Sequence, residues 1–348
     1  MKKMLPIIIS ALLVFSACSA KPSVHTLKVF NWGVYIDDTV IKDFEAKYDA
    51  KVIYDNFESN EAMYTKLQGG EKYDVLVPSD YMIERLITEK KLQKLDFKKI
   101  PNYSGIIESL KSLPSDPKNE YSVPYFWGNV GLLYNSDNVA LSELEEQGWN
   151  ILQNTKYASK VYVYDSERDA FMIAYKALGY SANSNVPAEI DAAYNWLKKL
   201  NETMDPVYVT DDVIDNMISG VKDIAVMYSG DATYIVSENE SMAYFVPLEG
   251  SNTWIDSMVI PSDASNPDLA HQWINYMLEI EVARKNTVFV GYTTPVQAVF
   301  DEVTSVGGDY EGIDAYVPRT NFLKDETFRY DEELKKTLSD LWTKVKAQ

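Results

Sequence analysis

Residues 27–78 decide the fold class, and they read LKVFNWGVYIDDTVIKDFEAKYDAKVIYDNFESNEAMYTKLQGGEKYDVLVP. Short apolar runs alternate in this stretch with segments whose apolar residues recur at helical spacing. The predicted elements, in chain order, are strand 27–32, helix 38–48, strand 51–54, helix 60–67 and strand 73–78. This order predicts a parallel sheet with helices on both faces.

The same alternation returns later in the chain. The predicted elements there are strand 162–164, helix 169–178, helix 189–201, strand 224–228 and strand 242–246. A second α/β unit is therefore expected, and a length of 348 residues also favours two domains over one.

Composition and charge exclude several classes of protein. Hydrophobic residues make up 46% of the chain, which indicates a folded globular protein and argues against disorder. Lys and Arg number 33 against 52 Asp and Glu, so the net charge is −19. A surface this acidic repels phosphates, and nucleic acid is therefore not expected as a partner.

The N-terminus has the pattern of an export signal. A positively charged start is followed by the apolar stretch 5–15, which is too short to span a bilayer. Residues 15–18, Phe-Ser-Ala-Cys, resemble a bacterial lipobox, and Cys18 is the only cysteine. We expect a signal peptide at 1–17, a lipidated tether at 18–26 and an extracytoplasmic, membrane-anchored protein. The alternative is ordinary secretion with Cys18 incidental.

Six clusters of aromatic and polar residues identify a candidate site. In open parallel sheets, ligands bind where the carboxyl ends of strands lead into loops. The clusters at or near such positions are 31–35, 78–81, 164–169, 228–231, 254–257 and 291–295. Trp and Tyr rings suit a ligand that is both cationic and apolar, and carboxylates would bind its charged ends. An aliphatic polyamine has this chemistry.

Several of these segments also resemble one known family. They are Phe30–Tyr35, Phe57–Tyr64, Val77–Tyr81, Val123–Gly128, Trp254–Ser257 and Gly291–Pro295. In this order they resemble the spermidine/putrescine-binding proteins of bacterial ABC importers, the PotD family. The resemblance implies a two-lobed, type II periplasmic-binding-protein fold with the ligand in the cleft between the lobes. It places lobe 1 at 27–130 and 255–297, and lobe 2 at 131–254 and 298–348.

The resemblance also implies roles for individual residues. The contacts it implies are Trp32, Tyr35, Ser79, Tyr81, Asp169, Tyr228, Asp231, Trp254, Asp256 and Tyr292, and the acid Asp80 beside Ser79 is a further expected ligand contact. Asp256 matches the family's central amine-binding acid, and Asp169 stands where the family has a longer Glu. Asp231 matches an acid of putrescine-type relatives. The expected partners are a polyamine and the permease and ATPase of an importer, with the chain a monomer.

Two departures leave the preferred polyamine open. Gly33 replaces a hydroxyl residue that is common after the Trp, and Ser166 stands where spermidine-type members often have an acid. The family's C-terminal contact has no clear counterpart around residues 328–330. Putrescine and spermidine therefore both remain candidates.

Enzyme functions fit the sequence poorly. Of the two histidines, His25 lies in the predicted tether, and His271 lies in a predicted helix where a surface or partly packed position is expected. No metal-ligand spacing, phosphate loop or dinucleotide motif is present, so no metal and no cofactor is expected. A hydrolase with paired carboxylates stays possible in principle. A second alternative is a lipoprotein that senses a polyamine or another cationic solute without importing it.

Overall fold

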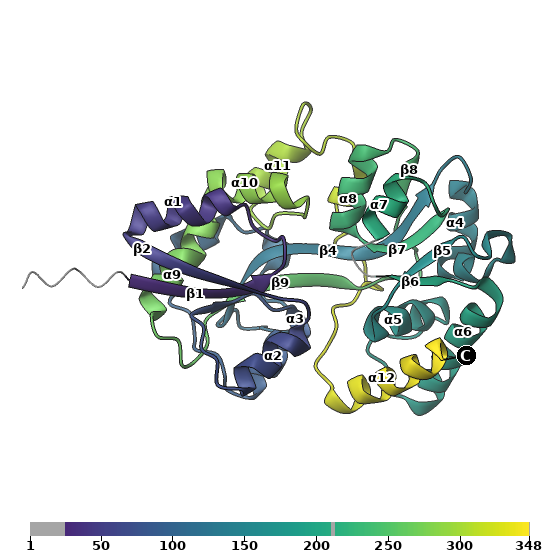
Figure 1. Cartoon of the computed structure of the whole chain (residues 1–348), viewed down its shortest axis with the longest axis horizontal. Coiled ribbons are helices and arrows are strands. Elements are labelled where there is room, and N and C mark those ends of the chain that lie inside the picture. The colour runs from purple at the N-terminus through teal and green to yellow at the C-terminus, as the bar shows by residue number, and fades with distance from the viewer. Residues whose placement is uncertain (1–24, 210–212, 348) are drawn as a thin grey trace, which may run out of the picture.

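The computed structural model describes residues 25–209 and 213–347, and the predicted signal peptide and Cys18 lie outside them. One mixed sheet runs through the molecule in the order β2-β1-β3-β9-β4-β7-β5-β6, with β8 beside β4 (Figure 1). The strands are β1 His25–Trp32, β2 Ala50–Phe57, β3 Val75–Leu76, β4 Ser122–Asn135, β5 Val161–Tyr164, β6 Val207–Val209, β7 Ile224–Tyr228, β8 Met242–Phe245 and β9 Thr253–Val259.

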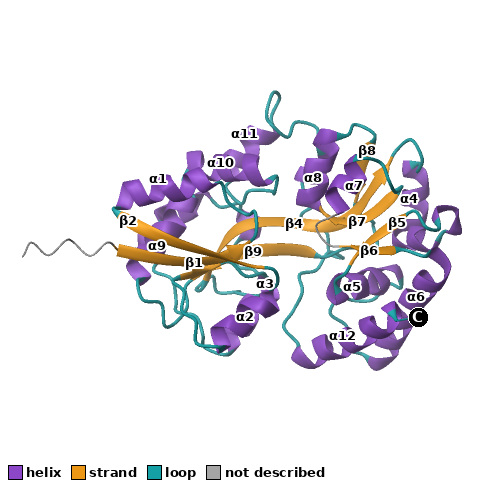
Figure 2. Ribbon diagram, viewed as in Figure 1, coloured by secondary structure: helices purple, strands orange, loops and turns teal. Residues whose placement is uncertain are grey.

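Helices cover both faces of this sheet (Figure 2). They are α1 Asp38–Tyr48, α2 Asn60–Gln68, α3 Asp80–Thr88, α4 Leu141–Gln147, α5 Glu167–Ala177, α6 Pro187–Met204, α7 Val213–Ile218, α8 Ser229–Glu238, α9 Pro267–Met277, α10 Ile280–Val290, α11 Gln297–Thr304 and α12 Glu332–Lys346. The first of them shows how local sequence sets the boundaries. Asp37 caps α1 by accepting the N–H of Thr39, and Asp49 ends the helix in the left-handed conformation.

The two ends of the sheet repeat one pattern. In the first lobe, β1 pairs in parallel with β2 and β3, and β9 is inserted antiparallel between β3 and β4. In the second lobe, β5 pairs in parallel with β6 and β7, and β4 is inserted antiparallel between β7 and β8. The 14 residues of β4 therefore belong to both lobes. The lobe limits expected from the sequence stay a prediction.

The structure corrects some sequence-based boundaries. The third predicted strand, 73–78, is reduced to the two residues of β3, and β1 begins at His25, inside the predicted tether. α5 begins at Glu167 rather than at Asp169, because the Ser166 hydroxyl accepts the N–H of Asp169 and caps the helix there. His271 is buried and does not lie at the surface. Its Nε2 accepts the backbone N–H of Asp96 at 2.9 Å, which satisfies this ring nitrogen inside the protein.

Candidate functional site

Asp256 is the centre of the first polar cluster. Side chains alternate along β9, so Trp254 and Asp256 point to the same face. The Asp256 carboxylate accepts the hydroxyl of Tyr35 at 2.8 Å and that of Ser79 at 2.6 Å. Ser79 lies in reach because it forms an isolated β-bridge with Asp256. Only 6% of Asp256 is exposed, and burial raises the pKa of its carboxyl to about 6.

The second cluster lies in the second lobe. Asp169, in the first turn of α5, accepts the hydroxyl of Tyr228 at 2.8 Å. Its other oxygen, Oδ1, is buried and has no hydrogen-bond partner among the described residues. Burial raises the pKa of Asp169. This carboxylate therefore keeps an unused acceptor in an environment where unpaired polar atoms are costly.

The third cluster joins the two lobes. Asp231, in the first turn of α8, accepts the hydroxyl of Tyr292 at 2.8 Å and that of Tyr164 at 2.7 Å. Tyr292 follows α10 of the first lobe, so its bond to Asp231 crosses between lobes. Burial raises the pKa of both tyrosines well above the usual range, so both hydroxyls remain protonated donors at neutral pH.

Aromatic rings connect the three carboxylates. Tyr292 contacts Tyr35 and Trp254, with 5.4 Å between ring centroids in both pairs. Tyr228 lies 6.1 Å from Trp254 and stacks on Tyr164 at 4.8 Å. The indole N–H of Trp254 is buried and has no partner within residues 25–209 and 213–347. The rings thus form one continuous apolar wall beside the three acids.

The turn from β3 into α3 adds a fourth group. Asn60 donates to the hydroxyls of Ser79, at 3.1 Å, and Tyr81, at 3.0 Å. Asp80 is only 2% exposed, and one of its oxygens has no partner in the described part of the chain. Burial raises the pKa of Asp80 to about 8, and the nearby Asp256 carboxylate adds to this effect. Asp80 therefore holds its proton to a higher pH than an exposed Asp does.

Ten of the eleven predicted residues lie in these groups, and Trp32 is the exception. The Trp32 ring packs against Phe57 at a centroid distance of 4.6 Å. Two residues that were not among the expected ligand contacts, Tyr164 and Asn60, hold Asp231 and Ser79 in place. Tyr164 could have been included because it ends a predicted strand. Asn60 lies in the segment Phe57–Tyr64 that carries the resemblance, but its contacts could not be predicted because its two partners lie 19 and 21 residues away along the chain.

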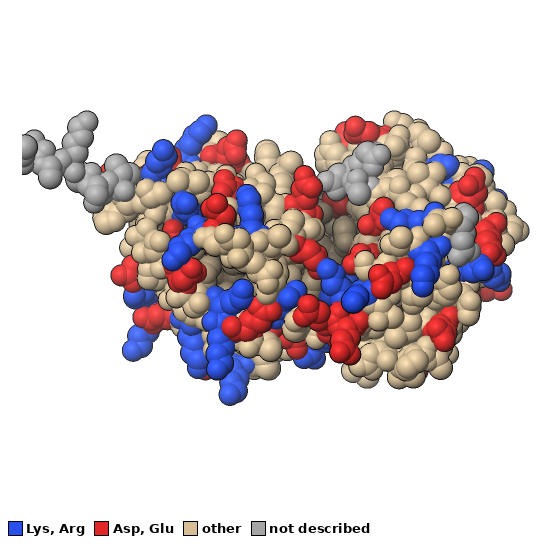
Figure 3. Space-filling model, turned by 60° about the horizontal axis from the view of Figure 1, so that its bottom comes forward, with Lys and Arg blue, Asp and Glu red and all other residues tan. Residues whose placement is uncertain are grey.

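A furrow separates the two lobes on one face of the molecule, and acidic side chains stand on both of its sides (Figure 3). In the described part of the chain, no three or more His, Cys, Asp and Glu side chains are arranged to hold a metal ion. Among those residues there is likewise no helix with the length and apolar composition that crossing a membrane requires.

Comparisons with known proteins identify the family. Residues 39–307 match the model of the bacterial extracellular solute-binding proteins. The spermidine/putrescine-binding periplasmic protein of Escherichia coli K12 is 33% identical over 273 residues, which cover 78% of each chain. The chain belongs to the bacterial extracellular solute-binding proteins. The predicted resemblance to spermidine/putrescine-binding proteins is thereby confirmed.

Solved structures of solute-binding proteins have the same fold. The spermidine/putrescine ABC transporter substrate-binding protein PotD of Streptococcus pneumoniae superposes with a TM-score of 0.80 at 34% identity, over 93% of this chain and 99% of that one. The TpPotD lipoprotein of Treponema pallidum has a TM-score of 0.80 at 26% identity, over 93% and 100%. The predicted type II, two-lobed α/β fold of this solute-binding protein is confirmed.

Proposed function

We propose that this solute-binding protein binds a polyamine, putrescine or spermidine, between its lobes and delivers it to an ABC permease without catalysing a reaction. One observation carries the proposal. Three aspartates, the buried Asp169 and Asp256 and the partly exposed Asp231, lie along one wall of aromatic rings and come from both lobes. The names of the relatives point to the same ligand.

The binding mechanism follows from the chemistry of these groups. Each of the three carboxylates is oriented by a neutral tyrosine hydroxyl, which leaves its negative charge available to an ammonium group. Charge-assisted hydrogen bonds of this kind contribute about 1.5–3 kcal/mol each. The rings of Trp254, Tyr228 and Tyr292 would cover the methylene segments and attract the cationic ends.

Ligand binding and lobe closure would be coupled. Without a ligand, like charges from both lobes oppose closure, whereas a dication or trication between them neutralises that repulsion. The permease and ATPase of the importer would receive the closed, ligand-bound form.

We further propose that the protein is a monomer anchored outside the cytoplasm through lipidated Cys18. The lipobox-like residues before Cys18 support the anchoring, as does the lipoprotein named among the structural relatives. Labelling of expressing cells with a radioactive fatty acid tests the lipid anchor. The label is expected in the wild-type chain and absent from Cys18→Ser, and equal labelling of both would contradict the proposal.

Calorimetric titration tests the main proposal. Residues 19–348, unfolded and refolded to remove co-purified ligand, would be titrated separately with putrescine, spermidine, spermine and cadaverine. Binding with a stoichiometry of one and a Kd between about 1 nM and 1 μM is expected for at least one of them. No heat with any of the four, from protein with a cooperative unfolding transition, would contradict polyamine binding.

A further inference from the structure

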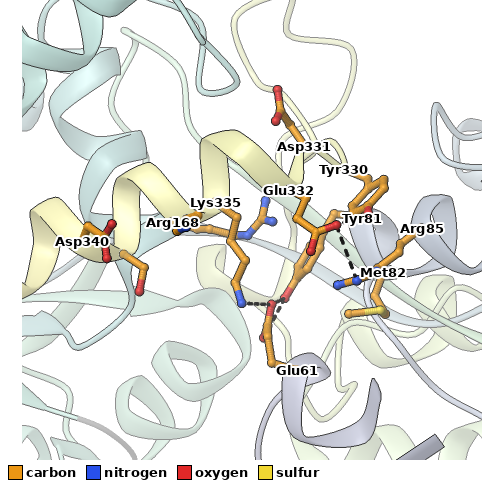
Figure 4. Close-up of a pocket in the computed structure, with 12 residues that line it drawn as sticks. Glu61, Tyr81, Met82, Arg85, Arg168, Tyr330, Asp331, Glu332, Lys335 and Asp340 are labelled. Atoms are coloured by element: carbon orange, nitrogen blue, oxygen red, sulfur yellow. Dashed lines mark hydrogen bonds and ion pairs between the residues drawn. The ribbon is translucent and has the colours of Figure 1, made fainter. Parts of the chain in front are cut away.

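A hollow of about 340 Å³ lies beyond Tyr81, and we call it the outer hollow (Figure 4). On one side it is lined by residues of α2 and α3 from the first lobe, including Glu61 and Arg85. On the other side it is lined by the start of α12, which packs on α5 and α6 of the second lobe. Asn60 of the candidate site donates to the hydroxyl of Tyr81, which also lines the outer hollow. The outer hollow therefore lies next to the candidate site.

Two of the four cationic side chains that line the outer hollow, Lys335 and Arg168, lie beside Glu61 and Tyr81. The Lys335 Nζ lies 3.2 Å from the Glu61 carboxylate, and this carboxylate lies 3.4 Å from the Tyr81 hydroxyl. The guanidinium of Arg168 lies 3.9 Å from the centroid of the Tyr81 ring. A primary ammonium on a carboxylate, next to a tyrosine, is the same chemistry that the site offers to a polyamine.

A short chain of hydrogen-bonded side chains separates Glu61 from Asp256. Four consecutive hydrogen-bond contacts connect the two carboxylates through Ser79 Oγ, Asn60 Nδ2 and Tyr81 OH. The contacts measure 2.6, 3.1, 3.0 and 3.4 Å, and each begins at the atom where the previous one ends. The separation between the Asp256 and Glu61 carboxylate oxygens therefore cannot exceed the sum of these four contacts. The terminal nitrogens of an extended triamine span a distance close to that limit. The nitrogens of a C4 diamine span much less.

We propose that Lys335 is a specificity residue that limits ligand length, by occupying the carboxylate that would otherwise bind the outer ammonium of a triamine. The inference rests on the proposed function. With Lys335 on Glu61, an incoming third ammonium finds its acceptor neutralised and a like charge beside it. A diamine, bound between Asp256 and the acids of the second lobe, does not meet Lys335.

The test compares Lys335→Met with Lys336→Met. Lys336 lines the same hollow and is exposed, but no ion pair connects it to Glu61 in the structure. In Lys335→Met the ratio of spermidine to putrescine affinity, measured by calorimetry, should rise about two- to fivefold, the range expected for a partly exposed ion pair. Lys336→Met should leave the ratio unchanged. The ratio is the readout because a general loosening of lobe contacts would weaken both ligands together.

A second variant keeps the outcome decisive. In Lys335→Met/Glu61→Gln, the gain for spermidine should disappear, because the freed acceptor is no longer charged. An unchanged ratio in Lys335→Met, or a gain that persists in the double variant, would overturn the role of Lys335. If the wild-type protein binds neither ligand, it is the proposed function that fails.

Discussion

At the scale of the residue, each of the three acids Asp169, Asp231 and Asp256 accepts a hydrogen bond from a tyrosine hydroxyl. Asp256 could be predicted from the sequence because an acid inside an apolar, strand-like run needs a partner. Its pairing with Tyr35 and Ser79 could not be predicted, because these residues lie 221 and 177 residues away along the chain. The sequence therefore predicts which groups carry the charge, and the fold determines which hydroxyls orient them.

Replacing Asp256 with Asn should weaken polyamine binding by about 2–4 kcal/mol, because a buried ammonium would lose its counter-charge. One of the Tyr35 and Ser79 hydroxyls can still donate to the amide oxygen and the other can rotate to accept from the amide NH2, so the fold should persist. Calorimetric titration measures the change. Asp191→Asn, at an exposed position of α6, is the matched control and should bind like wild type. Equal affinity of the two variants would remove Asp256 from the binding site.

Asp80 should make the ligand-free protein less stable as the pH rises. The pKa of an unstructured Asp is about 3.9, and burial raises that of Asp80 to about 8. The folded state therefore holds this proton more tightly than the unfolded state, so the contribution of Asp80 to the free energy of unfolding falls between about pH 4 and pH 8. Asp256 and Asp169, whose pKa values are also raised, act in the same direction.

Urea unfolding of the ligand-free protein across this pH range measures the effect. Asp80→Asn cannot ionise, so its free energy of unfolding should fall less steeply with pH than that of the wild type. Identical pH profiles for the two proteins would show that Asp80 does not change its protonation on unfolding.

At the scale of the element, helices were easier to predict than strand partners. The ranges of α1 and α2 follow from caps and apolar spacing close to their ends. The insertion of β9 between β3 and β4 depends on contacts between distant segments, which local periodicity does not encode. The short length of β3 has the same origin, because only Val75 and Leu76 have paired neighbours.

The start of α8 is an element-scale test of contact between the lobes. A Cβ at Gly230 would lie 1.7 Å from Cδ1 of Tyr292, and the φ angle of Gly230 does not otherwise require glycine. Gly230→Ala should therefore displace Tyr292, break its bond to Asp231 and lower polyamine affinity at least about tenfold, with only a small change in Tm. Gly105→Ala, with nothing within 4 Å of its Cβ, is the control. Wild-type affinity in Gly230→Ala would mean that this contact is not needed for binding.

At the scale of the whole molecule, the two-lobed fold and the family could be predicted, since several separate segments carry the resemblance. The ion pairs between the C-terminal segment and the first lobe could not be predicted from the sequence. Arg329 binds Glu84 of α3, with Nε at 3.0 Å from Oε2, and the N–H of Tyr330 donates to the same carboxylate at 2.8 Å. Lys335 and Glu61 form a second such pair. These contacts hold the lobes together on one side of the furrow.

Glu84→Gln should shift the ligand-free protein towards an open form. Because 48% of the Arg329 side chain is exposed, the pair contributes at most about 1 kcal/mol. Polyamine affinity should fall by up to about fivefold, and the radius of gyration from small-angle X-ray scattering should rise. Glu120→Gln removes a pair with Lys94 inside the first lobe and should change neither quantity. Equal scattering curves for Glu84→Gln and wild type would rule out this role for Glu84.

The position of β9 has a consequence for synthesis of the chain. The ribosome makes β1, β2, β3 and β4 early, but β3 and β4 become joined only through Thr253–Val259. Until that segment emerges, both strands have unpaired edges, and the nascent first lobe lacks the strand that completes its core. Completion of the first lobe therefore waits for residues from the last third of the chain, while β5 to β8 of the second lobe are already available to pair.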